Sequence, residues 1–207
     1  LGAGVMGAQI AAHLANANVP VVLFDLAAEG ADKNAIVNKA LANLGKLSPA
    51  PLASKAIAQR IAAANYDEHL EQLKDCDLII EAIAERLDWK KSLYAKILPF
   101  VGAKTVLASN TSGLSINALS EVLDESLHHR FCGVHFFNPP RYMHLVELIP
   151  CSSTDADVLS SLESFLVSNL GKGVVFAKSA CFPSCLSCTT RRSSRWASMK
   201  SMRSPVR

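Results

Sequence analysis

The first residues of the chain combine a glycine pattern with a later acid in a way that suits phosphate and ribose binding. Gly2, Gly4 and Gly7 form the pattern G-x-G-x-x-G. In such a loop the first glycine permits a tight turn, the second lets the backbone approach a pyrophosphate, and the third lets helix and strand pack closely. Asp25 comes 21 residues after Gly4 and closes an apolar run. A carboxylate at that place would bind the hydroxyls of a ribose, so the pattern predicts a dinucleotide site.

The same region also indicates which dinucleotide would bind. No arginine stands close behind Asp25 to accept a 2′-phosphate, which favours NAD over NADP. The structural alternative for this segment is an ordinary glycine turn beside a strand-end acid.

His135 and Glu147 form a second pair of residues that could do chemistry. They lie twelve residues apart in two apolar segments. An imidazole exchanges protons near neutral pH, which suits it to act as a general base. A carboxylate bonded to the other ring nitrogen would fix the tautomer and stabilise the imidazolium that forms. A lone histidine at a strand end is more often structural, so this assignment depends on the surrounding motif.

The elements that must position these residues alternate between helical and strand-like patterns. We expect helices over residues 8–16, two between 27 and 75 broken near 48–51, then 87–98, 116–123 and 155–169, the last capped by Ser153 or Thr154. We expect strands over residues 19–26, 78–82, 105–109, 131–137, 144–149 and 173–178. Because the strands lack polar alternation, the order predicts a doubly wound α/β fold with a parallel sheet. The strand that should precede Gly2 is truncated to Leu1.

Charge and composition exclude several classes of protein. The net charge is +3, but residues 179–207 hold five Arg, one Lys and no acid, which leaves −3 for residues 1–178. The body therefore has no nucleic-acid footprint, and the sequence has no apolar run long enough to span a membrane. We expect residues 179–207, with eight Ser and no hydrophobic period, to be a disordered or non-native basic tail. Its three cysteines (Cys181, Cys185 and Cys188) are too irregularly spaced for a zinc site, and we expect no bound metal.

Two later segments carry a specific resemblance. They are ASNTSGLSI at residues 108–116 and HFFNPPRYMHLVELI at residues 135–149. Together with GAGVMG, Asp25 and EAIAERLDWKK, they resemble the NAD-binding domain of the L-3-hydroxyacyl-CoA dehydrogenase family over residues 1–178. The resemblance implies a Rossmann-like domain with a helical insertion at about 27–75 that touches the CoA tail. It also implies NAD-dependent oxidation of an L-3-hydroxyacyl-CoA to the 3-ketoacyl-CoA in fatty-acid β-oxidation, with His135 as the base.

The resemblance also implies roles for further residues. Ser112 would hydrogen-bond the substrate oxygen beside the nicotinamide, Asn138 would contact the cofactor near the nicotinamide, and Glu85 and Lys90 would make further cofactor contacts. Val5 and Met6, inside the glycine motif, would lie against the cofactor as well. As structural alternatives, Ser112 could cap a turn, and Glu85 and Lys90 could form a solvated helix face.

After residue 178 the sequence departs from the family pattern. In the family an all-helical C-terminal domain follows, which completes the substrate site and forms the dimer, and no counterpart of it is visible here. With no targeting signal in the sequence, we expect a cytoplasmic protein. Two other functions stay open at this point: a dinucleotide-binding remnant without turnover, and a related enzyme that oxidises a different hydroxy acid.

Overall fold

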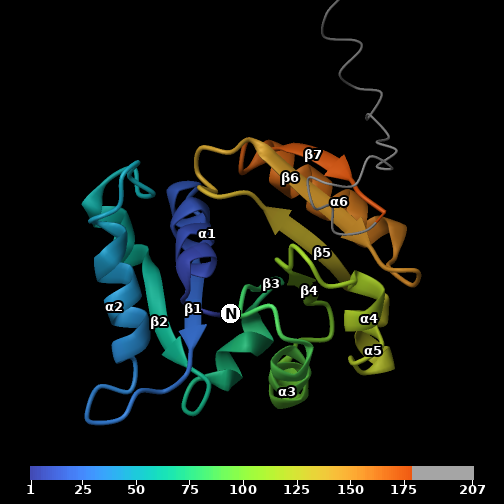
Figure 1. Ribbon diagram of the computed structural model, residues 1–207, viewed down its shortest axis with the longest axis horizontal. Helices are drawn as coiled ribbons and strands as arrows, with labels where there is room; N and C mark the ends of the chain where they lie inside the picture. Colours follow the sequence, from blue (N-terminus) through green and yellow to red (C-terminus); the bar gives the residue numbers. More distant parts are fainter. Residues whose placement is uncertain (179–207) are drawn as a thin grey trace, which may run out of the picture.

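A computed structural model describes residues 1–178 as an α/β protein (Figure 1). The helices are α1 (Val5–Asn16), α2 (Ala35–Leu44), α3 (Leu87–Ile97), α4 (Ile116–Ser120), α5 (Glu125–His128) and α6 (Ala156–Ser168), with short 3₁₀ segments η1 (Lys55–Arg60), η2 (Leu70–Asp75) and η3 (Leu98–Phe100). The strands are β1 (Val21–Asp25), β2 (Ile61–Asn65), β3 (Leu78–Glu81), β4 (Val106–Ser109), β5 (Phe131–Phe136), β6 (Leu145–Pro150) and β7 (Gly173–Phe176). The predictions for residues 179–207, including those for their three cysteines, lie outside the described residues.

The strands form two ladders. β1 pairs with β2, and the second ladder has the order β3-β4-β5-β6-β7. All neighbours are parallel except β5 and β6, which are antiparallel. The connection between those two strands, residues 137–144, is too short for a parallel crossover, which takes about a dozen residues or more. The prediction of a doubly wound α/β fold is confirmed, with a sheet that is mostly rather than wholly parallel.

Leu1 and Gly2 connect the two ladders. The amide of Gly2 donates to the carbonyl of Phe24 in β1 at 2.8 Å. On the other side, the terminal amine of Leu1 donates to the carbonyl of Ile80 at 2.6 Å, and the amide of Ala82 donates to the carbonyl of Leu1 at 2.8 Å. These bonds follow the pattern of a parallel strand between β1 and β3, where the N-terminus lies in Figure 1. The glycine loop therefore begins in the middle of the sheet.

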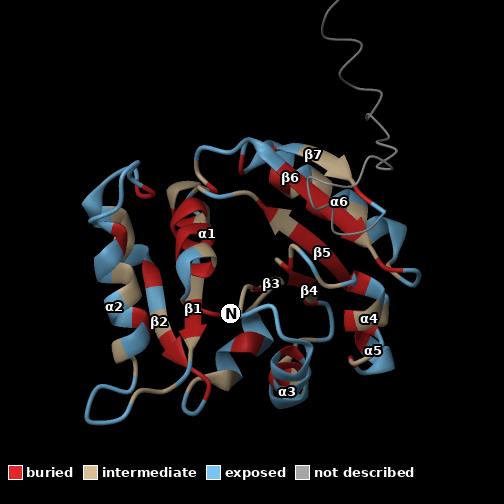
Figure 2. Ribbon diagram, in the orientation of Figure 1, coloured by how far each residue is buried: buried red, intermediate tan, exposed pale blue. Residues whose placement is uncertain are grey.

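Burial explains which positions in the strands can be polar. β5 is buried along its length except at His135, which is the partly exposed position in an otherwise apolar strand (Figure 2). α1 packs against β1 through small residues, because Ala8, Ala11, Ala12 and Ala15 are all buried in one cluster with Leu23. Alanine lets the helix axis approach the strand closely, and so brings the glycine loop against the sheet.

One expected helix and one expected helix cap are wrong. The segment 27–75 does not hold two helices, because after α2 its second half contains the strand β2, whose five residues pair in register with β1. The alanines of Ile61–Asn65 favour a helix in isolation, but pairing with a buried strand outweighs local propensity. The N-cap position of α6 is Asp155, not Ser153 or Thr154, and its side chain forms no capping hydrogen bond. The hydroxyl of Thr154 instead donates to the carbonyl of Phe131 at 2.6 Å.

Smaller differences concern where helices begin and end. α1 begins at Val5, three residues earlier than expected, and the short helix α5 was not expected at all. The longest helix in residues 1–178, α6, has 13 residues, fewer than the roughly 20 that a membrane-spanning helix requires.

Candidate cofactor and catalytic site

The three glycines of the loop differ in what surrounds them. Gly2 has a φ of 92°, and an added Cβ would lie 2.9 Å from the carbonyl oxygen of Ala82. A Cβ on Gly7 would lie 1.8 Å from the carbonyl oxygen of Gly2, so the helix meets the loop there backbone to backbone. A Cβ on Gly4 would meet nothing within 4 Å. Gly2 and Gly7 thus shape the loop, whereas Gly4 borders open space.

The open space lies at the N-terminus of α1. Gly4 is the N-cap of this helix, and no side chain caps the helix end. The first N–H groups of a helix have no partner within the helix, and the positive end of its dipole favours an anion. Gly4 and Val5 are exposed there, and Met6 is partly buried. The arrangement can therefore bind a phosphate group through backbone amides.

Asp25 lies at the end of β1 and is bonded to the glycine loop. Its Oδ2 accepts a hydrogen bond from the amide of Ala3 at 2.6 Å, and its Oδ1 accepts one from the amide of Leu26 at 2.7 Å. Each carboxylate oxygen can accept more than one bond, so both keep capacity for a hydroxyl donor. The loop and its acid are thus held as one unit.

His135 and Glu147 meet across the antiparallel strands β5 and β6. They are register partners, and Nδ1 of His135 lies 2.9 Å from Oε2 of Glu147. Their side chains are 12% and 10% exposed, so the bond is largely shielded from water while the ring keeps some access to solvent. The ring of Phe137 packs against His135 with centroids 4.6 Å apart. With Nδ1 bonded to the acid, Nε2 is the ring nitrogen left to exchange a proton.

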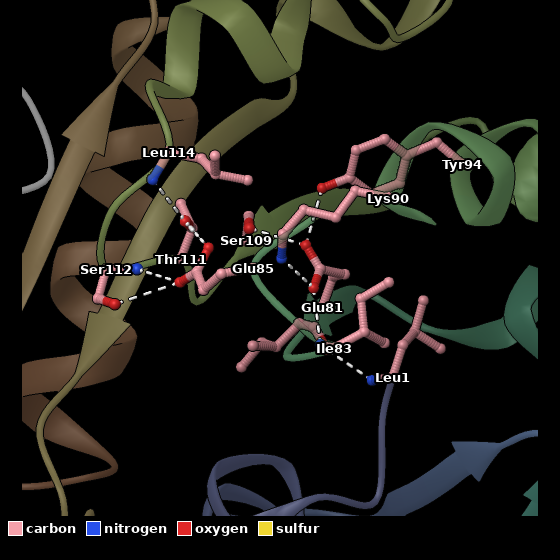
Figure 3. Close-up of polar contacts among 11 residues, drawn as sticks. Leu1, Glu81, Ile83, Glu85, Lys90, Tyr94, Ser109, Thr111, Ser112 and Leu114 are labelled. Carbon is pink, nitrogen blue, oxygen red and sulfur yellow. Dashed lines mark hydrogen bonds and ion pairs between the residues drawn. The ribbon is translucent and has the colours of Figure 1, made fainter. Parts of the chain in front are cut away.

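Ser112 is bonded to Glu85 in a polar cluster between the loops that follow β3 and β4 (Figure 3). Oε1 of Glu85 accepts bonds from the amide of Ser112 at 2.7 Å and from its hydroxyl at 3.2 Å. Oε2 accepts a bond from the hydroxyl of Thr111 at 2.5 Å. Partial burial acts to raise the pKa of Glu85, but these hydrogen bonds and the positive charge of Lys90 outweigh it and lower the pKa. Glu85 is therefore a carboxylate that ties the two loops together, and it precedes α3 instead of lying on a helix face.

Lys90 lies near Glu85 and is buried (Figure 3). Its Nζ forms an ion pair with Oε1 of Glu81 at 2.6 Å, and the two side chains are 1% and 0% exposed. Glu81 also accepts bonds from the amide of Ile83, the hydroxyl of Tyr94 and the hydroxyl of Ser109, at 2.8–2.9 Å (Figure 3). Burial and the charge of Glu81 raise the pKa of Tyr94 well above its usual value. A cofactor contact by Lys90 would require this side chain to leave the ion pair. The structural alternative, in which Lys90 lies on a solvated helix face, is wrong because the side chain is buried.

Asn138 follows β5 and reaches α1. Its Oδ1 accepts a bond from Nε2 of Gln9 at 3.2 Å, and Gln9 lies two residues after Gly7. One position before the Thr111–Ser112 pair, Oδ1 of Asn110 accepts a bond from the amide of Phe136 at 2.9 Å. These bonds connect the end of β5 with the glycine-loop helix on one side and with the β4 loop on the other.

The structure therefore brings the expected residues together in three groups: the glycine loop with Asp25, Ser112 with Glu85, and His135 with Glu147. Sequence reasoning missed the residues that support them, which are Gln9, Glu81, Asn110 and Thr111. A signal for some of these existed, because Glu81 and Asn110 are polar residues at the carboxyl ends of buried strands. In parallel sheets those ends form the ligand-binding edge.

Known proteins with similar sequences and structures identify the family of this chain. The family model of the 3-hydroxyacyl-CoA dehydrogenase NAD-binding domain matches residues 1–180. A probable 3-hydroxyacyl-CoA dehydrogenase from Deinococcus radiodurans is 42% identical over 178 residues, which are 86% of this chain and 51% of the relative. A 3-hydroxybutyryl-CoA dehydrogenase from Bradyrhizobium diazoefficiens is 36% identical over 181 residues, covering 86% of this chain and 59% of the relative.

Among solved structures, (S)-3-hydroxybutyryl-CoA dehydrogenase from Ralstonia eutropha superposes with a TM-score of 0.69 at 34% identity. The match covers 86% of this chain and 62% of that one. The chain thus spans between half and two thirds of the length of these three relatives. Since the family model matches most of the chain, this protein belongs to the 3-hydroxyacyl-CoA dehydrogenase family, in which it corresponds to the NAD-binding domain.

Proposed function

We propose that this chain supplies the cofactor site and the catalytic base of an enzyme that oxidises L-3-hydroxyacyl-CoA to 3-ketoacyl-CoA in fatty-acid β-oxidation. The observation that carries the proposal is the 2.9 Å bond between His135 and Glu147 in a sheet whose middle carries a dinucleotide loop. A binding module has no need of an imidazole held by a carboxylate. We also propose that residues 1–178 act as one domain.

NAD is the cofactor, and the residues present suit its two halves. The exposed Gly4 at the start of α1 leaves room for the pyrophosphate, and Asp25 is available for the ribose hydroxyls on the adenosine side. Asn138 is exposed at the end of β5 and serves the nicotinamide side. Bound NAD would accept the hydride that leaves the carbon bearing the hydroxyl group.

The chain's own residues handle the proton. Nε2 of His135 takes the hydroxyl proton as the hydride leaves, which turns the alcohol into a ketone. The carboxylate of Glu147 accepts the hydrogen bond from Nδ1–H and stabilises the imidazolium. The hydroxyl of Ser112 positions the substrate oxygen. To do so it exchanges its 3.2 Å bond with Glu85 for one with the substrate, while the amide of Ser112 keeps the loop bound to Glu85.

A chimera provides the test. Residues 1–178 replace the matching segment of the Deinococcus relative, whose remaining sequence supplies the rest of the protein. Absorbance of NADH is followed with NAD and 3-hydroxybutyryl-CoA, with free 3-hydroxybutyrate and with other hydroxy acids. NADH binding, followed by fluorescence, shows that the chimera is folded.

Turnover of the CoA ester is the expected result. A preference for free hydroxy acids would favour a related hydroxy-acid dehydrogenase and contradict the substrate class. Binding of NADH with no turnover of any substrate would favour a nucleotide-binding remnant and contradict the catalytic part of the proposal.

A further inference from the structure

Lys172 is a buried lysine with an unusual set of partners. It lies between α6 and β7 and is 4% exposed. Its Nζ donates to the main-chain carbonyls of Pro140 and Met143, the latter at 2.8 Å, and takes part in none of the ion pairs within residues 1–178. Burial lowers the pKa of Lys172 to about 8. Burying an ammonium is unfavourable unless hydrogen bonds compensate, so its two carbonyl contacts are what hold it there.

Both carbonyls belong to the connection between β5 and β6, residues 137–144. This connection starts directly after the strand that carries His135, and Asn138 is its second residue. Within it, the amides of Tyr142 and Met143 both donate to the carbonyl of Pro139 at 3.0 Å. This turn directs the carbonyls of Pro140 and Met143 to a single ammonium.

The connection is held from three sides. Lys172 binds its middle, and Nη1 of Arg141 donates to the carbonyls of Ala50 and Leu52 at 2.8 Å. At its beginning Gln9 binds Asn138. The first two contacts involve no residue assigned to cofactor or substrate, and they leave Asn138 exposed beside α1.

From this geometry we propose that Lys172 is a positioning residue, which holds the 137–144 connection so that Asn138 meets the nicotinamide half of the cofactor. The inference rests on the proposed function, because that function assigns Asn138 to the cofactor. Lys172 does not touch the cofactor, and its effect passes through the carbonyls of Pro140 and Met143. Small displacements of a positioned group weaken its contacts strongly, which makes such a support effective.

The proposal predicts a selective effect. In the proposed function the adenosine half binds to the glycine loop and Asp25, and the hydrogen bonds of Lys172 go to Pro140 and Met143 and to neither of these. Loss of the ammonium therefore weakens the binding of NADH and spares the binding of ADP-ribose, which lacks the nicotinamide. A general loss of structure would weaken both ligands together.

Calorimetric titration of the whole 207-residue chain with NADH and with ADP-ribose tests this. For Lys172→Met we expect the Kd of NADH to rise about fivefold, the scale of one neutral hydrogen bond that Asn138 would lose, and the Kd of ADP-ribose to change by less than about twofold. Asn138→Ala should produce the same selectivity, and the double variant should lose no more than either single one. Lys91→Met, at an exposed lysine of α3, is the matched control and should leave both constants unchanged.

If Lys172→Met fails to fold, Lys172→Gln replaces it. Its shorter amide can serve one carbonyl, so a smaller loss with the same selectivity is expected. Three results would overturn the inference and leave the proposed function intact. They are equal weakening of NADH and ADP-ribose binding, an unchanged ratio of the two Kd values, and effects that add to those of Asn138→Ala. Failure of the unaltered chain to bind either ligand would overturn both.

Discussion

The imidazole of His135 and the carboxylate of Glu147 are brought together by strand pairing alone. The two residues are directly opposite in the antiparallel ladder of β5 and β6, and their side chains meet at 2.9 Å. Opposite residues in such a ladder place their Cβ atoms about 4.5–5.5 Å apart on the same face. The orientation of the imidazole therefore depends on two buried strands and not on a flexible loop, which keeps it preorganised before any ligand binds.

Two matched substitutions in the glycine loop should affect different properties, one the stability and the other the binding of ADP-ribose. Gly7→Ala places a Cβ 1.8 Å from the carbonyl oxygen of Gly2, so the backbone must shift. We expect a loss of about 1–3 kcal/mol in the free energy of unfolding, the usual cost of overpacking. Gly4→Ala meets nothing within 4 Å and should change stability by less than about 1 kcal/mol, yet weaken ADP-ribose binding because the methyl group occupies the approach to the helix N-terminus.

Urea unfolding and ADP-ribose titration of both variants measure these effects. Gly45→Ala is the control, since its Cβ would lie 3.7 Å from the carbonyl oxygen of Ala42 and far from the loop in sequence. Unimpaired ADP-ribose binding by Gly4→Ala would contradict the assignment of this helix end to the pyrophosphate.

Asp25→Asn tests the choice of dinucleotide. The variant keeps one side-chain oxygen for the amides of Ala3 and Leu26 but loses the charge that we propose binds ribose hydroxyls and repels a 2′-phosphate. We expect NAD binding to weaken about tenfold, as for a lost charge-assisted bond, and NADPH to be rejected less strongly than before. Titrations with NADH and NADPH give the two constants. A variant that discriminates between NADH and NADPH as well as the unaltered chain does would show that Asp25 only supports the glycine loop.

The sequence predicts much of the fold because the decisive signals are local. The glycine spacing predicts the loop, and an apolar run that ends in Asp25 predicts β1. The histidine within an apolar segment indicates the partly exposed position of β5. β2 has no such signal, since its central alanines favour a helix and only pairing with β1 makes it a strand.

The supporting residues of the site also escape local patterns. Glu81 ends an apolar strand, but Lys90, nine positions later, looks like a surface charge in the sequence, and only the packing of α3 onto β3 and β4 buries it against Glu81. Their pairing depends on where a helix lies relative to two strands, which spacing along the chain does not specify. The same reason hides Lys172, whose partners lie 29 and 32 residues away.

The Glu81–Lys90 pair predicts strong coupling in stability. Removing one partner leaves an uncompensated buried charge, so Glu81→Gln or Lys90→Met should each lower the free energy of unfolding by about 3–5 kcal/mol. The double variant should lose clearly less than the sum of the two, because no buried charge is left alone. Denaturant unfolding of the three variants measures this cycle. Single losses below about 1 kcal/mol would mean that water reaches the pair.

His13 predicts how stability depends on pH. This residue is buried on α1, and its Nε2 has no hydrogen-bond partner in residues 1–178. Burial, with the nearby positive charge of Lys172, lowers the pKa of His13 from 6.5 to about 4. The unfolded chain therefore binds this proton first, and the stability present above pH 6.5 is lost as the pH falls towards 4.

The measurement is the urea midpoint between pH 7 and pH 4 for the unaltered chain and for His13→Gln. The variant should show a flatter dependence, whereas His129→Gln, at an exposed histidine, should follow the unaltered chain. A His13→Gln profile parallel to the unaltered one would assign the acid sensitivity to other groups.

Steady-state kinetics of His135→Gln in the chimera, with NADH binding measured in parallel, test the central claim most directly. If His135 is the base, kcat for the CoA ester falls by about 10²–10⁴-fold while the Kd of NADH stays within about twofold. Glu147→Gln should also lower kcat, because the imidazolium loses its carboxylate partner. A His135→Gln enzyme whose kcat stays within about threefold of the unaltered one would contradict the account.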